Sequence, residues 1–356
     1  LSMNQTNPLR GILASLHAAI RPHRLAMRFS AARRTMTLPQ TAIQPLGEAT
    51  VPIVGGLKAT VGLRATKETK DITYRFTGNG TPGTLPSYYQ HADLDDTFLT
   101  GRAALSYDWN DDIMTYVSVG RGAVAGGMPW TSTGAALGRD MPSYPTSTSW
   151  TYEAGFKSTL LDGRMTLNGS VFFNDVKNGH LLVVDPATFA FSTAALDYET
   201  YGAELEARFE VTPGFNVFGG LGYTHAELKN VPVGSLTGAS SGNTVPNVPN
   251  WAANIGAEYR FAASDIGISQ GEIVATAMYQ FVGTRQADVA NHFSLDSYGI
   301  VNARIGWEGE KASVYAFGTN LFDERYEAVG NYYGPTALTV RPGPGRIIGV
   351  GASVKF

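Results

Sequence analysis

Apolar and polar side chains alternate along most of this chain with a period of two. The clearest case is residues 201–211, where Tyr201, Leu205 and Phe209 share one parity and charged residues fill the other. Side chains of a β-strand point alternately to the two faces of its sheet, so the pattern predicts strands with one apolar face. About thirteen such segments occur: 41–53, 57–70, 97–109, 113–122, 148–160, 164–177, 198–211, 215–227, 250–262, 271–284, 297–308, 312–325 and 341–356. Strands of about ten residues cross a bilayer when tilted.

Short and long connections alternate strictly between these segments. The short ones are 54–56, 110–112, 161–163, 212–214, 263–271 and 309–311, and the long ones are 67–96, 121–147, 178–197, 228–249, 284–296 and 326–339. In an up-and-down arrangement, every short turn then lies on one side. Outer-membrane barrels have short periplasmic turns and long external loops, whereas a soluble sandwich has no reason to sort its loops by length.

The two parities also differ in chemistry. Four of the five tryptophans, at 109, 150, 251 and 307, fall on the apolar parity at strand ends, as in the aromatic girdles of a membrane barrel. The polar parity carries both signs of charge, at Arg64, Arg102, Glu153, Lys157, Glu204, Glu206, Arg208, Glu258, Arg260 and Arg304. We expect this parity to face a wet lumen, with most of the charges paired to one another or solvated.

Composition supports an all-β, transmembrane, antiparallel up-and-down β-barrel. The chain has 41 Gly, 17 Tyr and 17 Phe among 356 residues, only 16% charged residues, and no apolar run long enough for a membrane helix. A net charge of −3 gives no reason to expect a nucleic-acid partner. The absence of Cys excludes disulfides and thiol chemistry. No convergent catalytic set or metal motif occurs, so we expect neither an enzyme nor a resident metal or cofactor; a barrel protease or lipase would need Ser, His and acidic residues clustered at the outer rim.

The first 40 residues differ from the rest. Residues 1–34 hold six Arg and no acidic residue. A secretory signal would need a longer apolar core and a small-residue cleavage site, so we expect a basic, weakly structured leader over 1–40 and a barrel portion over 41–356. Residues 24–37 could alternatively add a fourteenth strand.

Several motifs resemble a known family. They include GLKATVGLRATKETKD, LSYDWNDDIMTYVSVGRG, TSWTYEAGFKSTLLDGRMTLNGSVFFNDV, YGAELEARFEVTPGFNVFGGLGYTHA, VPNWAANIGAEYRF and, most specifically, VYAFGTNLFDERY followed by PGPGRIIGVGASVKF. In this order, over residues 41–356, they are similar to the carboxyl-terminal part of the barrel of a TonB-dependent outer-membrane receptor.

This resemblance implies import of scarce ligands across the bacterial outer membrane, most often ferric siderophores. Such receptors have a 22-stranded barrel, a plug domain and a short energy-coupling box, and this sequence contains neither of the last two. The TonB-type energising complex is therefore expected as a partner only if a plug and coupling box are supplied. Phe356 is similar to the terminal aromatic residue that the barrel assembly machinery reads.

The number of strands raises a closure problem. The first and the thirteenth strand would run in the same direction, so joining them directly needs an unusual parallel seam. We therefore expect part of a receptor rather than a reduced barrel. A passive outer-membrane pore and a non-functional truncated barrel are the alternatives.

Ligand capture is expected on the long loops. Their aromatic and imidazole side chains, suited to metal chelates with flat or apolar faces, are Tyr88, Tyr89, His91, Trp130, Tyr144, Tyr332 and Tyr333. These side chains could instead only pack their own loops. Asp93, Asp95 and Asp96 could bind calcium, but their spacing fits no EF-hand, and a solvated acidic turn is the expected reading.

Overall fold

The computed structural model describes residues 33–37, 40–44, 46–78, 87–129, 143–185, 190–235 and 237–355. The main sheet consists of β1 (Arg33–Thr37), β2 (Gln40–Ile43), β3 (Leu46–Val54), β4 (Leu57–Thr77), β5 (Tyr88–Asp108), β6 (Ile113–Val124), β7 (Ser147–Leu160), β8 (Met165–Asp185), β9 (Ala190–Thr212), β10 (Phe215–Lys229), β11 (Trp251–Ala262), β12 (Glu272–Val282), β15 (Tyr298–Glu308), β16 (Ala312–Thr319) and β19 (Ile347–Val354). The smaller elements are η2 (Ala263–Ile266) and the pairs β13 (Arg285–Gln286) with β14 (Ser294–Leu295) and β17 (Glu327–Tyr332) with β18 (Leu338–Pro342).

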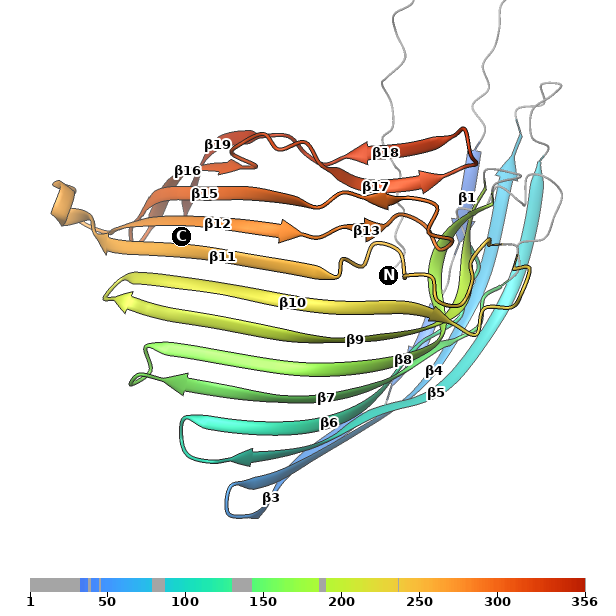
Figure 1. The fold of residues 1–356 in the computed structure, drawn as a ribbon, viewed down its shortest axis with the longest axis horizontal. Coiled ribbons are helices and arrows are strands. Elements are labelled where there is room, and N and C mark those ends of the chain that lie inside the picture. Colours follow the sequence, from blue (N-terminus) through green and yellow to red (C-terminus); the bar gives the residue numbers. More distant parts are fainter. Residues whose placement is uncertain are drawn as a thin grey trace, which may run out of the picture.

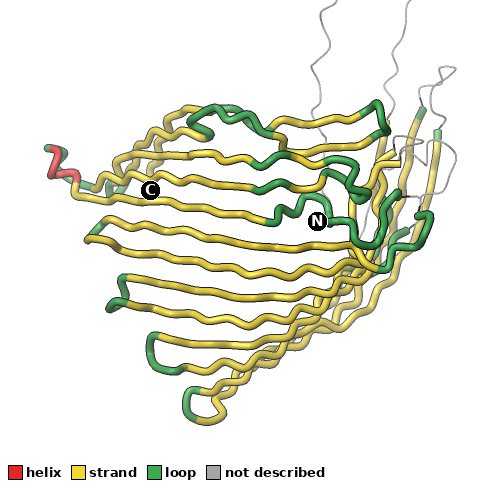
Figure 2. The backbone as a smooth tube through the Cα atoms, viewed as in Figure 1, coloured by secondary structure: helices red, strands yellow, loops and turns green. Residues whose placement is uncertain are grey.

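The main sheet is one continuous antiparallel array in which the strands from β4 to β19 follow one another in chain order. It runs from β3 at the bottom of Figure 1 to β19 at the top, with the short turns on the left. Figure 2 shows that most of the described backbone is strand. Among the described residues, no helix is long and apolar enough to span a membrane.

The thirteen strand positions agree with the thirteen segments predicted from the sequence, and the described part of the possible fourteenth strand, Arg33–Thr37, adds no further position. β1, β2 and β3 all pair with β4, one after the other along its length, so together they occupy one strand position. The hydrogen-bonded path through the sheet therefore has thirteen positions. Arg33–Thr37 only prolongs the first of them; residues 1–32 lie outside the described residues.

The sheet has two chemically distinct faces. One, which we call the outer face, carries Leu63, Leu205 and Ile305, all around half exposed. The other, the inner face, carries charged residues such as Glu204. The register fixes this division, because Leu205 lies opposite Gly169 and Leu221 while Glu204 lies opposite Ser170 and Gly222. Leu205, Phe209, Ile305 and Val354 are not gathered in a dry core.

Aromatic rings mark both ends of the outer face. The Trp109 ring meets the Tyr107 ring edge-on near a short turn. At the opposite end of the strands, the ring centroids of Tyr223 and Trp251 are 5.0 Å apart. Along β11, Trp251 and Phe261 are ten residues apart. This separation is about 33 Å along a strand and about 25 Å across a membrane at a tilt of about 40°. It matches the apolar band of a membrane barrel, so the tryptophan pattern predicted the right positions.

Two predicted long loops are largely strand. The sheet continues through residues 67–77 and 88–96, and again through 178–185 and 190–197. In the first of these extensions the polarity of the faces is exchanged. Ile72, Tyr74 and Phe76 are buried on the inner face, while Asp71 and Arg75 are exposed on the outer one. The apolar inner side chains pack against Met128 of the β6–β7 connection, which explains why the apolar parity lies on the inner face here.

Candidate ligand-recognition region

The long connections fold over the inner face above the apolar band. Leu196 and Leu228, on the parity of Glu204, pack with Val245 from connection 230–250 and Val289 from the segment between β13 and β14. Leu228 is fully buried. This cluster, which we call the loop core, fixes two connections over the inner face of β8–β10.

Asp197 holds the edge of this region in place. Its carboxylate accepts hydrogen bonds from the backbone N–H of Asn178 (2.9 Å) and the side-chain amide of Asn230 (3.1 Å). Both asparagines have a positive φ, near 53° and 51°, which Asn tolerates better than most residues. Burial raises the pKa of Asp197, but these two hydrogen bonds and the Lys177 ammonium 3.5 Å away outweigh it and lower the pKa overall.

A second anchor ties the β6–β7 connection to the top of β4 and β5. Lys70 donates to the carbonyl of Gly126 (2.6 Å), and Asp96 accepts from the Gly126 N–H (3.0 Å) and from the Thr146 hydroxyl. Met128 then packs on the inner-face cluster that contains Ile72. Asp96 is therefore a structural anchor on a strand.

The acidic run 93–96 does not form the expected turn. It lies within β5, and its members point to alternate faces. Asp95 pairs with Lys67 (3.5 Å), and Asp93 lies near His91. The three carboxylates therefore do not converge on one calcium ion.

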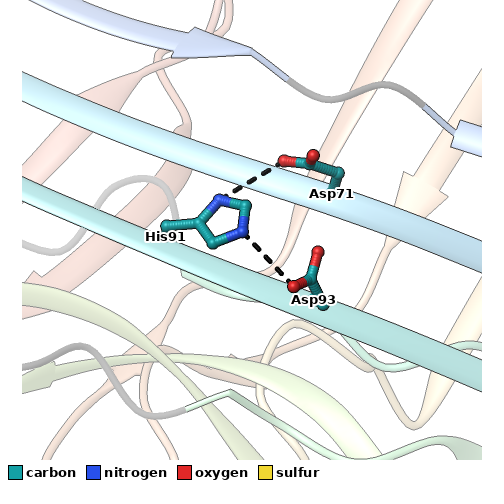
Figure 3. A group of neighbouring side chains, drawn as sticks. All are labelled: Asp71, His91 and Asp93. Carbon is teal, nitrogen blue, oxygen red and sulfur yellow. Dashed lines mark hydrogen bonds and ion pairs between the residues drawn. The ribbon is translucent and has the colours of Figure 1, made fainter.

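Three of the predicted ligand-binding residues lie in β5 rather than in a loop. Tyr88 packs against the inner-face cluster. Tyr89 points outward, with the Arg75 guanidinium 5.6 Å from its ring centroid, and His91 also points outward, between Asp71 and Asp93 (Figure 3). A ligand above the inner face would therefore approach the face of the sheet that carries Tyr88. Tyr89 and His91 lie on the opposite, outer face.

The remaining predicted residues make separate contacts. The Tyr144 ring lies 4.5 Å from that of His180, the Tyr332 ring stacks on His292 at 3.6 Å, and the Tyr333 ring meets Phe191 edge-on at 6.2 Å. Trp130 lies outside the described residues. The contact between Tyr333 and Phe191 joins the β17–β18 hairpin to the tip of β9. Each of these three ring contacts therefore links a long connection to another segment of the chain.

The inner wall within the apolar band contains both paired and unpaired charges. Arg260 binds Glu272 (2.8 Å) and Glu308 (3.3 Å), which confirms mutual pairing there. By contrast, no ion pair is recorded within the described part of the chain for Glu204 or Glu206. Both line an inner-face pocket of about 480 Å³ together with Asn254, Gln280 and Tyr298. Sequence reasoning found these charges, but it could not tell which would remain unpaired, because pairing depends on the register.

An antiparallel sheet with an apolar outer face between two aromatic girdles, and long connections folded over a charged inner face, defines a membrane-barrel wall. The chain belongs to the family "TonB dependent receptor-like, beta-barrel", whose pattern it matches over residues 20–321. The resemblance predicted from the motifs is therefore confirmed.

Individual relatives agree with this assignment. The chain is 27% identical over 241 residues to the ferrichrome outer membrane transporter/phage receptor of Escherichia coli (strain K12), covering 66% of this chain and 29% of that protein. It is 24% identical over 263 residues to the pesticin receptor of Yersinia pestis, covering 74% and 37%. These relatives are receptors or transporters. The chain thus spans about a third of their length.

Solved structures show the same fold. The ferric yersiniabactin uptake receptor FyuA from Yersinia pestis superposes with a TM-score of 0.73 at 20% identity, covering 91% of this chain and 47% of that one. The copper transporter OprC superposes with a TM-score of 0.63 at 16% identity, covering 89% and 48%. At these identities the likeness concerns the fold alone.

Proposed function

We propose that this chain forms barrel wall in an outer-membrane receptor that takes up metal chelates, ferric siderophores in the first place. The observation that carries the proposal is the outer face, apolar between two aromatic girdles and therefore suited to lipid. Family membership adds the class of cargo, since relatives include the ferrichrome transporter and the metal-pseudopaline receptor of Pseudomonas aeruginosa.

The two edges of the sheet support a role as part of a closed barrel. Among the described residues, β3 and β19 each pair on one side only. The four most exposed large apolar side chains of the main sheet lie on these two strands: Val350 at 82%, Leu46, Ile348 and Val54. Unpaired backbone groups are too costly in hydrocarbon for such edges to stay open in a membrane.

Strand direction limits what can close the sheet. β3 and β19 both run towards the short-turn side, because twelve antiparallel steps separate them along the path. Antiparallel closure therefore requires an odd number of additional strands. The added strand beside β3 and the one beside β19 would both run towards the long connections. A second copy inserted in the same orientation would meet these edges in parallel, so we propose closure by further receptor strands.

Chelate recognition is proposed on the side of the long connections. Tyr88, Tyr144, Tyr332 and Tyr333 supply aromatic surfaces there, and Trp130 is proposed with them from the sequence alone. The outward positions of Tyr89 and His91 argue against direct contact. Coupling to a TonB-type complex is proposed only through a plug and coupling box. Assembly is proposed to use Phe356, which lies two positions after the last residue of β19 in the sequence.

Binding by the closed receptor barrel that contains this chain, purified and reconstituted in a membrane, tests this proposal. Ferrichrome and an iron–catecholate complex serve as probes, and quenching of tryptophan fluorescence reports binding. We expect saturable quenching by at least one probe, which Tyr332→Ala weakens. Absence of binding combined with a large steady single-channel conductance would instead favour a passive pore. The loop core over the inner face argues against such a pore.

A further inference from the structure

Asp71, His91 and Asp93 form a compact group on the outer face of the β4–β5 extension (Figure 3). The Nδ1 atom of His91 lies 3.4 Å from Oδ1 of Asp71, and its Nε2 atom lies 3.3 Å from Oδ2 of Asp93. One donor atom from each residue can be chosen so that all three lie within 4.8 Å of one another. The group lies above the apolar band, away from the inner-face pocket.

The strand register places like charges directly opposite each other. Asp71 is the cross-strand partner of Asp93, and His91 pairs with Thr73 one step further along the same face. Two carboxylates in directly opposed positions repel each other and destabilise a sheet. In the described part of the chain, no Lys or Arg ion pair is recorded for either carboxylate, so their charge is left to His91 or to a cation from solution.

The other described histidine–carboxylate pairs lack this arrangement. His225 lies 3.4 Å from Glu227, but Lys229 already pairs with that carboxylate at 3.1 Å. His292 contacts Asp288 at 2.8 Å, and its ring is stacked on Tyr332. Only His91 meets two carboxylates in the part of the molecule that the structure covers.

We propose that Asp71, His91 and Asp93 bind one divalent transition-metal ion, of which Zn²⁺ is the representative. An imidazole and two carboxylates are a ligand set that Zn²⁺ accepts at about 2.0–2.2 Å, and two donors at a tetrahedral angle are then about 3.4 Å apart. The Asp71–His91 separation already has this value. The Asp93 side chain, 78% exposed, is free to turn towards the same ion.

Three protein ligands would leave a fourth position for water or a ligand from outside. The ion would neutralise the opposed carboxylates and link β4 to β5 above the membrane. The hydrogen bond between the Thr73 hydroxyl and Nδ1 of His91 (3.3 Å) helps to orient the ring in the absence of metal. The sequence analysis named His91 and Asp93 separately but not Asp71, because only strand pairing brings Asp71 to His91.

Isothermal titration of the chelator-treated full chain in detergent with ZnCl₂ tests the proposal. We expect one Zn²⁺ per chain, at least about tenfold weaker binding in His91→Ala and in Asp71→Asn, and unchanged binding in the matched control His225→Ala. Zn²⁺ should also raise the apparent Tm of the unmodified chain and of His225→Ala, but not that of His91→Ala.

The alternative outcomes are distinct. Unchanged Zn²⁺ affinity in both site variants would overturn the proposal, and so would an equal loss in His225→Ala. Ca²⁺ binding as tight as Zn²⁺ binding and indifferent to His91→Ala would show that the carboxylates act alone, which contradicts the assigned imidazole. If His91→Ala does not fold, as judged by circular dichroism, Asp71→Asn gives the same test from the neighbouring strand.

Discussion

Glu48 of the edge strand β3 reaches across Gly62 of β4 to form a two-point ion pair with Arg102 of β5. The Nε and Nη2 atoms of Arg102 donate to the two carboxylate oxygens at 2.9 and 2.8 Å. A Cβ atom at Gly62 would lie 2.9 Å from Glu48 Oε2. The glycine therefore leaves room for a contact that ties the edge strand to the second strand along.

Replacing this glycine should loosen the edge of the sheet. In Gly62→Val we expect Glu48 to be displaced from Arg102 and the backbone amides of β3 to exchange faster with deuterium than those of β9. Gly47→Ala is the matched control, because nothing lies within 4 Å of its Cβ position. Equal exchange in the two variants would mean that the ion pair does not hold β3.

Asp197 should make the ends of β8 and β9 beside the long connections sensitive to acid. Its pKa is lowered from the usual 3.8, so its stabilising effect is complete above that value and is lost as the pH falls through the lowered pKa. In Asp197→Asn, the local free energy of opening at Asn178 should already be lower at neutral pH by about 1 kcal/mol. The Asn178 amide should then exchange roughly fivefold faster, and the variant should lack this acid transition.

Asp265→Asn, an exposed change at the opposite end of the sheet, is the control for Asp197. It should leave both the exchange rate and the acid transition as they are in the unmodified chain. An acid transition that persists unchanged in Asp197→Asn would assign it to another carboxyl group.

Two glycines of the last strand should not tolerate a side chain. A Cβ atom at Gly349 would lie 2.7 Å from Cζ of Phe317, and one at Gly351 would lie 2.4 Å from Cζ of Tyr315. Gly349→Ala should therefore lower stability by about 1–3 kcal/mol, because the ring has to move out of its place. Chemical unfolding in detergent measures this. Gly47→Ala is the control, because nothing lies within 4 Å of its Cβ position. Comparable stability of the two variants would show that Phe317 moves at little cost.

The loop core should depend on one buried leucine. Leu228 is fully buried, so Leu228→Ala should cost about 2–5 kcal/mol within the loop core and expose residues 230–249 to proteases. Val233→Ala, in the same connection but completely exposed, should not change the cleavage rate. If both variants are cleaved alike, the connection is held by contacts other than the loop core.

The sequence was sufficient for the architecture because a membrane wall imposes a strict alternation. The pattern around Leu205 and Glu204 identified both faces, and the tryptophans identified the band. The pattern predicts a loop at Ile72, Tyr74 and Phe76, which is wrong: the strand continues there, but its apolar side chains change to the inner face. It also could not distinguish paired from unpaired charges, since Arg260 finds Glu272 and Glu308 only through the register.

The most direct test of the account compares neighbouring positions on β9 in a bilayer. Because the chain contains no Cys, a single Cys can be introduced at each position from 203 to 208 in turn. A nitroxide attached to that Cys then reports on one position of the reconstituted protein. The spin labels at 203, 205 and 207 should be relaxed by lipid-soluble oxygen, and those at 204, 206 and 208 by a water-soluble nickel chelate. The reverse pattern, or no alternation, would contradict the assignment of the outer face to lipid and of the inner face to an aqueous lumen.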